Sequence, residues 1–422
     1  MKITGIPRRY QLLLLCFCAA FISYIDRVNI SVATIAMQES LGWSDSVKGY
    51  VLSSFFIGYM LLQAPAGYIA SRYGGKVVLT VAVAWWSLFT ILTPLAAIVS
   101  LPLLIITRIA MGLGEAAMFP GAYALLGRWI PVPERSRSVA LLLSGVPIGT
   151  VFALIVTGWI ITEFGWPSVF YVFGGAGLIW MVFWLPNASD GPELDPKISD
   201  SEKDYIVQNS ETPTGNKRFY TPWKLILTAP AVWALIINHF CSNWSFYILL
   251  AWLPSYFKQV QGFSITYAGL FSAAPWLINF LMINIASWIA DTMIERGRSV
   301  TFVRKLMQSF GLGVSGVFLL LVTVTSDGLT SVILMCAALG AHGFTWSGFG
   351  PNHLDLAPRH AGLLLGITNT AGTLPGVIGI AVTGLLVEAT GAFTSAFILA
   401  ACINFIGVLV WLFWGTGRKI VD

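Results

Sequence analysis

Phe21-Ile22-Ser23-Tyr24-Ile25-Asp26-Arg27-Val28-Asn29 places an acid and a base inside a hydrophobic segment long enough to cross a bilayer. A second such segment contains Thr107-Arg108-Ile109-Ala110-Met111-Gly112-Leu113-Gly114-Glu115. A charge near the centre of a bilayer costs about 2.5 to 17 kcal/mol, depending on the reference state. Arg108 and Glu115 lie about two helical turns apart on one helix face. That face must contact protein or water rather than lipid.

The charges of Asp26, Arg27, Arg108 and Glu115 sum to zero, so these residues could form a purely structural cluster. We favour a functional interpretation, in which a cavity holds an anion on arginine and a proton on a carboxylate. The planar donor fork of a guanidinium suits a carboxylate or a phosphate. Glu115 is the preferred proton-coupling residue. Asp26 is the second candidate, with gating or packing as its alternative role.

Composition indicates an integral membrane protein. The chain of 422 residues is 56% hydrophobic and 10% charged, with a mean hydropathy of +0.78, whereas about a quarter of the residues in soluble domains are charged. Its five cysteines are scattered without metal-ligand spacing, so we expect no disulfide framework, no metal site and no cofactor. No motif of a nucleophile with a base, or of a metal cluster, indicates an enzyme.

Apolar segments of about 20 residues predict membrane spans. They lie at residues 11–34, 47–69, 77–99, 101–127, 138–161, 167–185, 230–257, 266–290, 301–324, 329–351, 361–386 and 392–414. We therefore predict an all-α protein with twelve transmembrane helices in two pseudo-symmetric six-helix bundles. The bundles cover residues 1–186 and 230–422. Residues 187–229 are polar and predict a cytoplasmic linker loop that contains a short surface helix.

The distribution of Lys and Arg predicts cytoplasmic N- and C-termini, because positive residues near span ends stay inside. Only Lys48 and Lys258 fall on the other side, and Arg27 and Arg108 lie within the membrane. The net charge of +5 therefore reflects topology and does not support a nucleic-acid partner. The apolar run after the basic N-terminus is longer than a signal peptide, so we expect it to be retained as the first helix. We expect a bacterial inner membrane, with an organelle membrane as the alternative.

The two halves of the sequence resemble each other. Arg137-Ser138-Val139-Ala140-Leu141 in the fifth span matches Arg359-His360-Ala361-Gly362-Leu363 in the eleventh, and Pro147 matches Pro375. The offset of six spans indicates a parallel repeat. Such repeats place a substrate site near the membrane midplane, between halves that rock against each other. No segment resembles the selectivity filter of a channel.

The junction Gly67-Tyr68-Ile69-Ala70-Ser71-Arg72-Tyr73-Gly74-Gly75-Lys76 resembles the Gly-x-Leu-Ala-Asp-Arg-x-Gly-Arg-Lys signature of the major facilitator superfamily. The resemblance implies a tight cytoplasmic turn whose charges latch neighbouring helices, with Gly67, Arg72, Gly74 and Lys76 as gating residues. Ser71 replaces the usual aspartate, which puts the usual charge relay in doubt.

Further stretches narrow the resemblance to the anion:cation symporters, which include sialin, vesicular glutamate carriers, type I phosphate transporters and bacterial sugar-acid permeases. They are Tyr24–Asn29, Phe240–Tyr247, Val303–Lys305, Asn352–Gly362 and Ile367–Thr370. By this resemblance Arg27 and Arg108 bind the substrate anion, and Glu115 and Asp26 couple protons. Ser242 stands where vesicular glutamate carriers have an arginine, which argues against their dicarboxylate preference.

The second half offers no buried charge for the substrate, so we expect its contacts to be polar or aromatic. The candidates are Ser242, Tyr247, Asn369 and Thr373. Ser, Thr and Asn also commonly tie transmembrane helices together, which is the alternative role of each of them.

Together these features predict a secondary active transporter of small organic anions, such as sugar acids or similar carboxylates, coupled to protons by alternating access. The alternatives are a sodium- or voltage-driven carrier of inorganic phosphate or another anion, and a receptor on the same fold that transports nothing. We expect a monomer whose partners are a small anion, protons or sodium, and the lipid bilayer.

Overall fold

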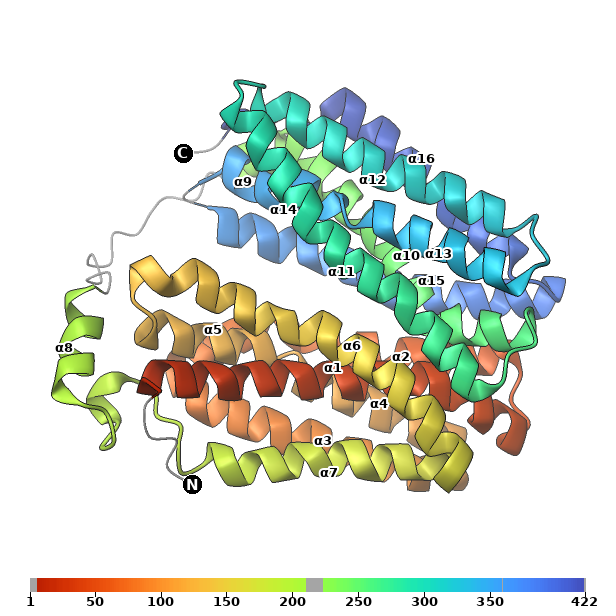
Figure 1. Cartoon of the computed structure of the whole chain (residues 1–422), viewed down its shortest axis with the longest axis horizontal. Coiled ribbons are helices and arrows are strands. Elements are labelled where there is room, and N and C mark those ends of the chain that lie inside the picture. Colours follow the sequence, from red (N-terminus) through yellow and green to blue (C-terminus); the bar gives the residue numbers. More distant parts are fainter. Residues whose placement is uncertain (1–5, 210–222, 359, 421–422) are drawn as a thin grey trace. The chain divides into compact units, whose positions relative to one another are not determined.

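The computed structural model describes residues 6–209, 223–358 and 360–420, so Arg359 of the predicted repeat lies outside the described residues. Within these ranges the regular structure is entirely helical (Figure 1). The longer helices are α1 (Arg8–Leu41), α2 (Asp45–Tyr73), α3 (Gly75–Val99), α4 (Leu101–Glu115), α5 (Met118–Trp129), α6 (Arg135–Phe164), α7 (Trp166–Trp184), α10 (Pro230–Gln259), α11 (Ile265–Glu295), α12 (Val300–Val322), α13 (Gly328–His342), α14 (Thr345–Leu356), α15 (Ala361–Thr390) and α16 (Thr394–Trp414).

The described helices agree with the predicted membrane spans. Eleven of them, counting α4 with α5 and α13 with α14, are long and apolar enough to cross a bilayer. The remaining predicted span, 47–69, lies within the 29-residue helix α2, which is less apolar because of residues such as Gln63. An all-helical protein with the predicted twelve spans is therefore confirmed.

Two predicted spans are interrupted. The predicted helix 101–127 is broken at Ala116-Ala117, directly after Glu115, and the predicted helix 329–351 is broken at Gly343-Phe344, directly after His342. Hydropathy did not reveal either break, because both flanks of each break are apolar and the run of spanning residues continues through it.

The described contacts divide the chain into two compact units. Unit 1 comprises residues 1–29, 57–153 and 163–219, and unit 2 comprises residues 30–56, 154–162 and 220–422. Helices α1, α2 and α6 therefore each contribute to both units. The bundles expected from the sequence, residues 1–186 and 230–422, are separated at the polar linker. This division remains a prediction.

In unit 2, Lys48 joins the beginning of α2 to α10. Its side chain is fully buried, and its Nζ donates to Oγ of Ser255 at 2.5 Å and to Oε1 of Gln38 at 3.2 Å. The same Nζ lies 5.3 Å from the ring centroid of Trp252. The sequence placed Lys48 at the end of a predicted span, and the structure shows that its side chain is held inside the protein.

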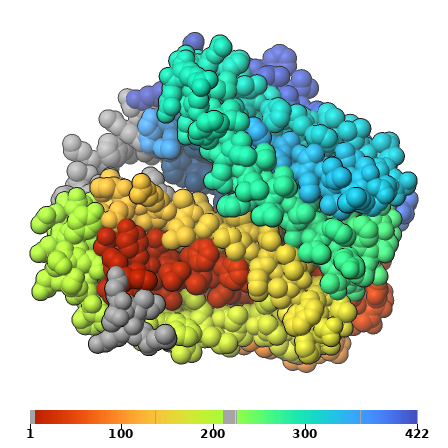
Figure 2. All heavy atoms as spheres, viewed as in Figure 1, coloured from red at the N-terminus to blue at the C-terminus, as the bar shows by residue number. Residues whose placement is uncertain are grey.

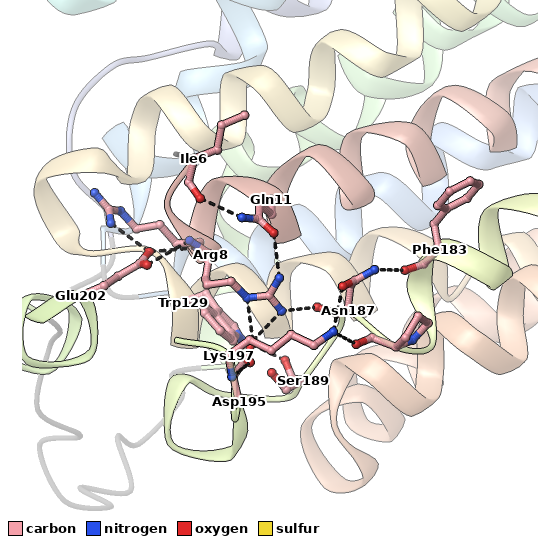
Figure 3. Close-up of polar contacts among 12 residues, drawn as sticks. Ile6, Arg8, Gln11, Trp129, Phe183, Asn187, Ser189, Asp195, Lys197 and Glu202 are labelled. Atoms are coloured by element: carbon pink, nitrogen blue, oxygen red, sulfur yellow. Dashed lines mark hydrogen bonds and ion pairs between the residues drawn. The ribbon is translucent and has the colours of Figure 1, made fainter. Parts of the chain in front are cut away.

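In unit 1, the linker packs against the beginning of α1. Figure 3 shows the guanidinium of Arg8 bonded to the Asp195 carboxylate at 2.8 Å and to the Gln11 side chain at 2.7 Å. Arg9 pairs with Glu202 at 3.0 Å, on the short helix α8 (Asp200–Gln208). In Figure 2 the yellow-green atoms of this linker lie beside the red atoms at the beginning of α1. The surface helix expected in the linker is thus present and is bound to the N-terminal helix.

Candidate functional site

The centre of the candidate site is an ion pair between α1 and α4. Nη2 of Arg27 lies 2.8 Å from Oε2 of Glu115, and Nε of Arg27 donates to the same oxygen at 3.0 Å. The hydroxyl of Ser23, one helical turn before Arg27, also donates to this oxygen at 3.1 Å. The other carboxylate oxygen, Oε1, is buried and accepts no hydrogen bond from the described residues. It therefore offers a site for a proton.

Two tyrosine rings flank the guanidinium of Arg27. The carbon Cζ of Arg27 lies 4.6 Å from the ring centroid of Tyr24 and 4.6 Å from that of Tyr59, which comes from α2. Arginine stacks favourably on aromatic rings, because the cation is attracted to the π-face. Both tyrosines are half-buried, whereas Arg27 is buried. The rings therefore hold the orientation of the donor fork even when its carboxylate partner changes charge.

The second charged pair lies deeper in unit 1. Asp26 and Arg108 are buried and lie close enough for a direct electrostatic interaction. The indole of Trp86 on α3 approaches the Asp26 carboxylate, but the two groups do not form a hydrogen bond of ordinary geometry. Arg108 also donates to the sulfur of Met111 at 2.9 Å. Arg27 thus has its acid on the other helix, whereas Arg108 interacts electrostatically with Glu115 on its own helix and with Asp26 on α1.

The structure therefore assembles Asp26, Arg27, Arg108 and Glu115 in one unit, as the sequence led us to expect. The hydrogen-bonded partner of Glu115 is Arg27 on α1, while Arg108 lies on the same helix as Glu115. No sequence pattern indicated a role for Ser23 or Tyr59. Tyr59 lies outside both charged runs, and only the packing of α2 brings it to Arg27.

In unit 2, the four polar candidates differ in burial. Ser242 is buried, and its hydroxyl accepts from Nε2 of Gln308 at 3.1 Å. Thr373 is buried and donates to the carbonyl of Asn369 at 2.8 Å. Tyr247 and the side chain of Asn369 are half-buried. This geometry favours helix packing for Ser242 and Thr373, and makes Tyr247 and Asn369 the better candidates for substrate contact.

The four residues expected to form the gating motif lie along the end of α2 and the start of α3. Gly74 has φ +85° and ψ 151°, a conformation that is essentially restricted to glycine. Oδ1 of Asp190 accepts from the backbone N–H of Lys76 at 2.8 Å, at the positive end of α3. Arg72 is exposed and lies over the ring of Tyr73, and a side chain at Gly67 would meet open space. Asp190, from the linker, thus brings a carboxylate to the junction where Ser71 lacks one.

The charges of the site are balanced by its own side chains. Among the residues that the structure describes, no group of three His, Cys, Asp or Glu residues could hold a metal ion. What the arrangement offers is two guanidinium groups for an anion and two carboxyl groups for protons.

Comparison with known proteins shows the family of the chain. Residues 16–380 match the sequence model described as Major Facilitator Superfamily. The chain is 45% identical over 416 residues to the chloroplastic ascorbate transporter of Arabidopsis thaliana, covering 99% of this chain and 76% of that protein. It is 42% identical to the chloroplastic sodium-dependent phosphate transport protein 1 of the same plant, covering 99% of this chain and 81% of the relative.

Vesicular glutamate transporter 1 of Xenopus tropicalis is a more distant relative. It is 34% identical over 437 residues, covering 98% of this chain and 76% of the relative. Among solved structures, the inward-open xylose transporter XylE from E. coli is similar with a TM-score of 0.77 at 13% identity, covering 96% of each chain. A bacterial homologue of the lysosomal transporter Spinster has a TM-score of 0.76 at 17% identity, covering 97% of this chain and 96% of the homologue. These two likenesses concern the fold.

Proposed function

The chain belongs to the Major Facilitator Superfamily, as a multi-pass membrane transporter of its anion-transporting branch, and from that premise we propose that it is a proton-coupled symporter of a small organic anion. Family membership confirms the resemblance seen in the sequence, and also the prediction that the chain is a transporter rather than an enzyme. The proton coupling and the nature of the anion are our proposal.

The observation that carries the proposal is the shared oxygen of Glu115. Arg27 directs the hydrogen bonds of Nε and Nη2 to the same oxygen, Oε2 of Glu115, which leaves Oε1 of Glu115 available for a proton. While Glu115 is ionised, it occupies the donor fork of Arg27, so an anion finds no open binding group. When Oε1 takes up a proton, the carboxyl becomes neutral and its attraction for the guanidinium weakens. The fork of Arg27 then becomes available for a substrate carboxylate.

Binding of proton and anion must therefore favour each other to the same degree, because a coupling free energy between two sites is reciprocal. The charges of Arg108 and Asp26 cancel each other. The pocket therefore stays neutral when the substrate anion replaces the ionised Glu115 as the partner of Arg27. A loaded carrier thus holds its anion without a net negative charge in the membrane. This neutrality lowers the cost of moving the site through the bilayer.

For the substrate we propose a hydroxylated carboxylate. The two arginines select a negative group, and the half-buried Tyr247 and Asn369 can bind hydroxyl groups. The name of the Arabidopsis ascorbate transporter is in keeping with such an anion. The phosphate transporter among the relatives supports the second candidate, a sodium-driven carrier of inorganic phosphate. A receptor on the same fold would bind the anion without moving it.

The membrane and the topology belong to the same proposal. We expect cytoplasmic termini and a functional monomer. The bacterial inner membrane expected from the sequence gains no support from the relatives, because the two plant proteins are both named chloroplastic. A plastid envelope is the alternative that these names favour, and fractionation of the source cells distinguishes the two membranes.

The test is uptake by purified protein in liposomes, with an inward proton gradient and without sodium, for ascorbate, hexuronate, aldonate, sialic acid, glutamate, aspartate and phosphate. Accumulation of one carboxylate that a protonophore abolishes supports the proposal. Uptake only after sodium is added supports the phosphate carrier. Binding without flux under every gradient supports the receptor.

A further inference from the structure

The two interrupted spans have the same internal layout. Helix α4 has 15 residues and is followed, after Ala116-Ala117, by the 12-residue helix α5. Helix α13 also has 15 residues and is followed, after Gly343-Phe344, by the 12-residue helix α14. The final residue of the first segment is Glu115 in one case and His342 in the other. The repeat therefore places a buried titratable side chain at the corresponding position of each half.

The contacts of these two side chains also correspond. Glu115 binds Ser23 and Arg27, which are one turn apart on α1, the first helix of the N-terminal half. His342 binds the backbone carbonyl of Ser242 at 2.9 Å, and its ring centroid lies 6.1 Å from that of Phe246. Ser242 and Phe246 are likewise one turn apart on α10, the first helix of the C-terminal half. An acid and a histidine show no similarity in sequence, so only the structure reveals that their positions correspond.

The hydrogen bond of His342 settles its tautomer. A carbonyl oxygen can only accept, so Nε2 of His342 must carry the hydrogen that binds Ser242. In the neutral ring Nδ1 is then an acceptor. Nδ1 is buried and has no hydrogen-bond partner among the described residues, and His342 is only 2% exposed. A proton can therefore be added at Nδ1 without breaking the bond that anchors the ring.

We propose that His342 is a second proton-binding site of the transporter, the C-terminal counterpart of Glu115, which takes up a proton at Nδ1 together with the substrate anion. This inference rests on the proposed function, because it adds a second coupled proton to the same cycle. The resulting imidazolium gives the C-terminal half a positive charge that attracts the anion. The unprotonated ring leaves that half neutral at this position.

The surroundings of His342 explain why the proton and the anion should arrive together. The helices packed against α13 carry the following charged and titratable residues: Asp291, Glu295 and Tyr267 on α11, Arg304 and Lys305 on α12, and His239, Cys241, Tyr247, Tyr256 and Lys258 on α10. On the continuing helix α14, His353 lies with its ring centroid 6.4 Å from that of His239, and Asp355 pairs with Arg304 at 2.8 Å.

None of these groups offers His342 a carboxylate partner in the described part of the chain. An isolated buried imidazolium is costly, because burial penalises the charged form. The substrate anion supplies the missing negative charge. Each of the two ligands therefore lowers the cost of binding the other.

The chain offers a matched control in His353. It is also a buried histidine of the same interrupted span, but both of its ring nitrogens are bonded, Nδ1 to the carbonyl of Gly350 and Nε2 to the hydroxyl of Thr368, each at 2.8 Å. Replacement of either histidine by glutamine removes a titratable ring from the C-terminal half. Glutamine at position 342 also keeps an N–H that can donate to Ser242. A purely structural role would therefore make His353→Gln, which loses more of its bonds, at least as impaired as His342→Gln.

The first measurement is the ring nitrogen chemical shifts of ¹⁵N-histidine-labelled full-length protein between pH 8 and pH 5, assigned by comparison with His342→Gln. The probes are sodium ascorbate, sodium glutamate and sodium phosphate, each in excess. We expect Nδ1 of His342 to change from the acceptor to the protonated type when one of these anions is added. A ring that stays neutral with every anion over this range overturns the proposal.

The second measurement is the accumulation ratio in liposomes under a gradient of one pH unit. Because one coupled proton multiplies the equilibrium ratio by the proton concentration ratio, His342→Gln should lower it about tenfold, while His353→Gln should leave it unchanged. An unchanged ratio in His342→Gln overturns the proposal. The ring could also be protonated with the anion while a proton gradient drives no uptake in the wild type. That result supports His342 as a proton-binding site and shows that the proposed symport is wrong.

Discussion

Nη2 of Arg27 lies 2.8 Å from Oε2 of Glu115, although the two residues are 88 positions apart in the sequence. The pair joins α1 to α4 inside unit 1, and both side chains are buried. A buried pair of this kind is strongly destabilised when one partner loses its charge. The same contact therefore connects the protonation of Glu115 to the availability of the Arg27 guanidinium for an anion.

Glu115→Gln should abolish the acceleration of uptake by a proton gradient while sparing exchange of internal for external substrate. The neutral amide mimics the protonated carboxyl, so Arg27 remains available for the anion but no proton is released. Loss of the pair should also lower stability by about 3 to 5 kcal/mol, which thermal unfolding in detergent checks. Ser23→Ala is the control, because it removes one hydrogen bond and keeps the carboxylate. Gradient-driven uptake that survives Glu115→Gln intact would contradict the assignment.

Tyr59→Leu should raise the KM for the anion about fivefold with little change in maximal rate. Loss of one ring from the guanidinium removes a cation–π interaction worth about 1 kcal/mol, and with it the fixed orientation of the donor fork of Arg27. Tyr59→Phe keeps the ring and should transport with the KM of the wild type. A larger defect in Tyr59→Phe than in Tyr59→Leu would show that the hydroxyl, rather than the ring, is what matters.

Gly74→Ala should destabilise the protein by about 1 to 3 kcal/mol, because alanine is strained at this backbone conformation. The added Cβ would also lie 2.5 Å from Oδ1 of Asp190, which binds the first turn of α3. Gly67→Ala is the matched control within the same motif, since the space around it is open. Thermal unfolding of both variants in detergent gives the comparison. Equal melting temperatures would exclude a special role for Gly74.

Asp327 should make the first turn of α13 sensitive to acid. Its carboxylate accepts from the backbone N–H of Thr330 at 2.7 Å, and hydrogen bonds from Thr330 hold the pKa of this exposed carboxyl below its usual value. A depressed pKa contributes stability above the unfolded value, and this contribution is lost as the pH falls through the folded value. Hydrogen exchange at Thr330 should therefore accelerate at low pH.

Asp327→Asn provides the comparison, because an asparagine caps a helix without titrating. Exchange at Thr330, measured relative to other helix termini, should then lose its additional acid dependence. The same dependence in both proteins would show that another group is responsible.

Much of the site was predictable from local patterns. Hydropathy located the spans, and the charges of Asp26, Arg27, Arg108 and Glu115 stood out because charged residues are rare in such segments. Lys48 could not be recognised in this way. Its position near the end of a predicted span is typical of a solvated charge, and only the packing of α2 against α10 buries it.

The sequence by itself determined that this protein is a bundle of membrane-spanning helices with a charged centre, since helical periodicity and the cost of charge in lipid act within one segment. Tertiary structure alone decided which groups meet: Glu115 with Arg27, Tyr59 over the guanidinium, Asp190 at the start of α3, and His342 at the position equivalent to Glu115. Contacts of this kind depend on how helices distant in sequence pack face to face. No single span carries that information.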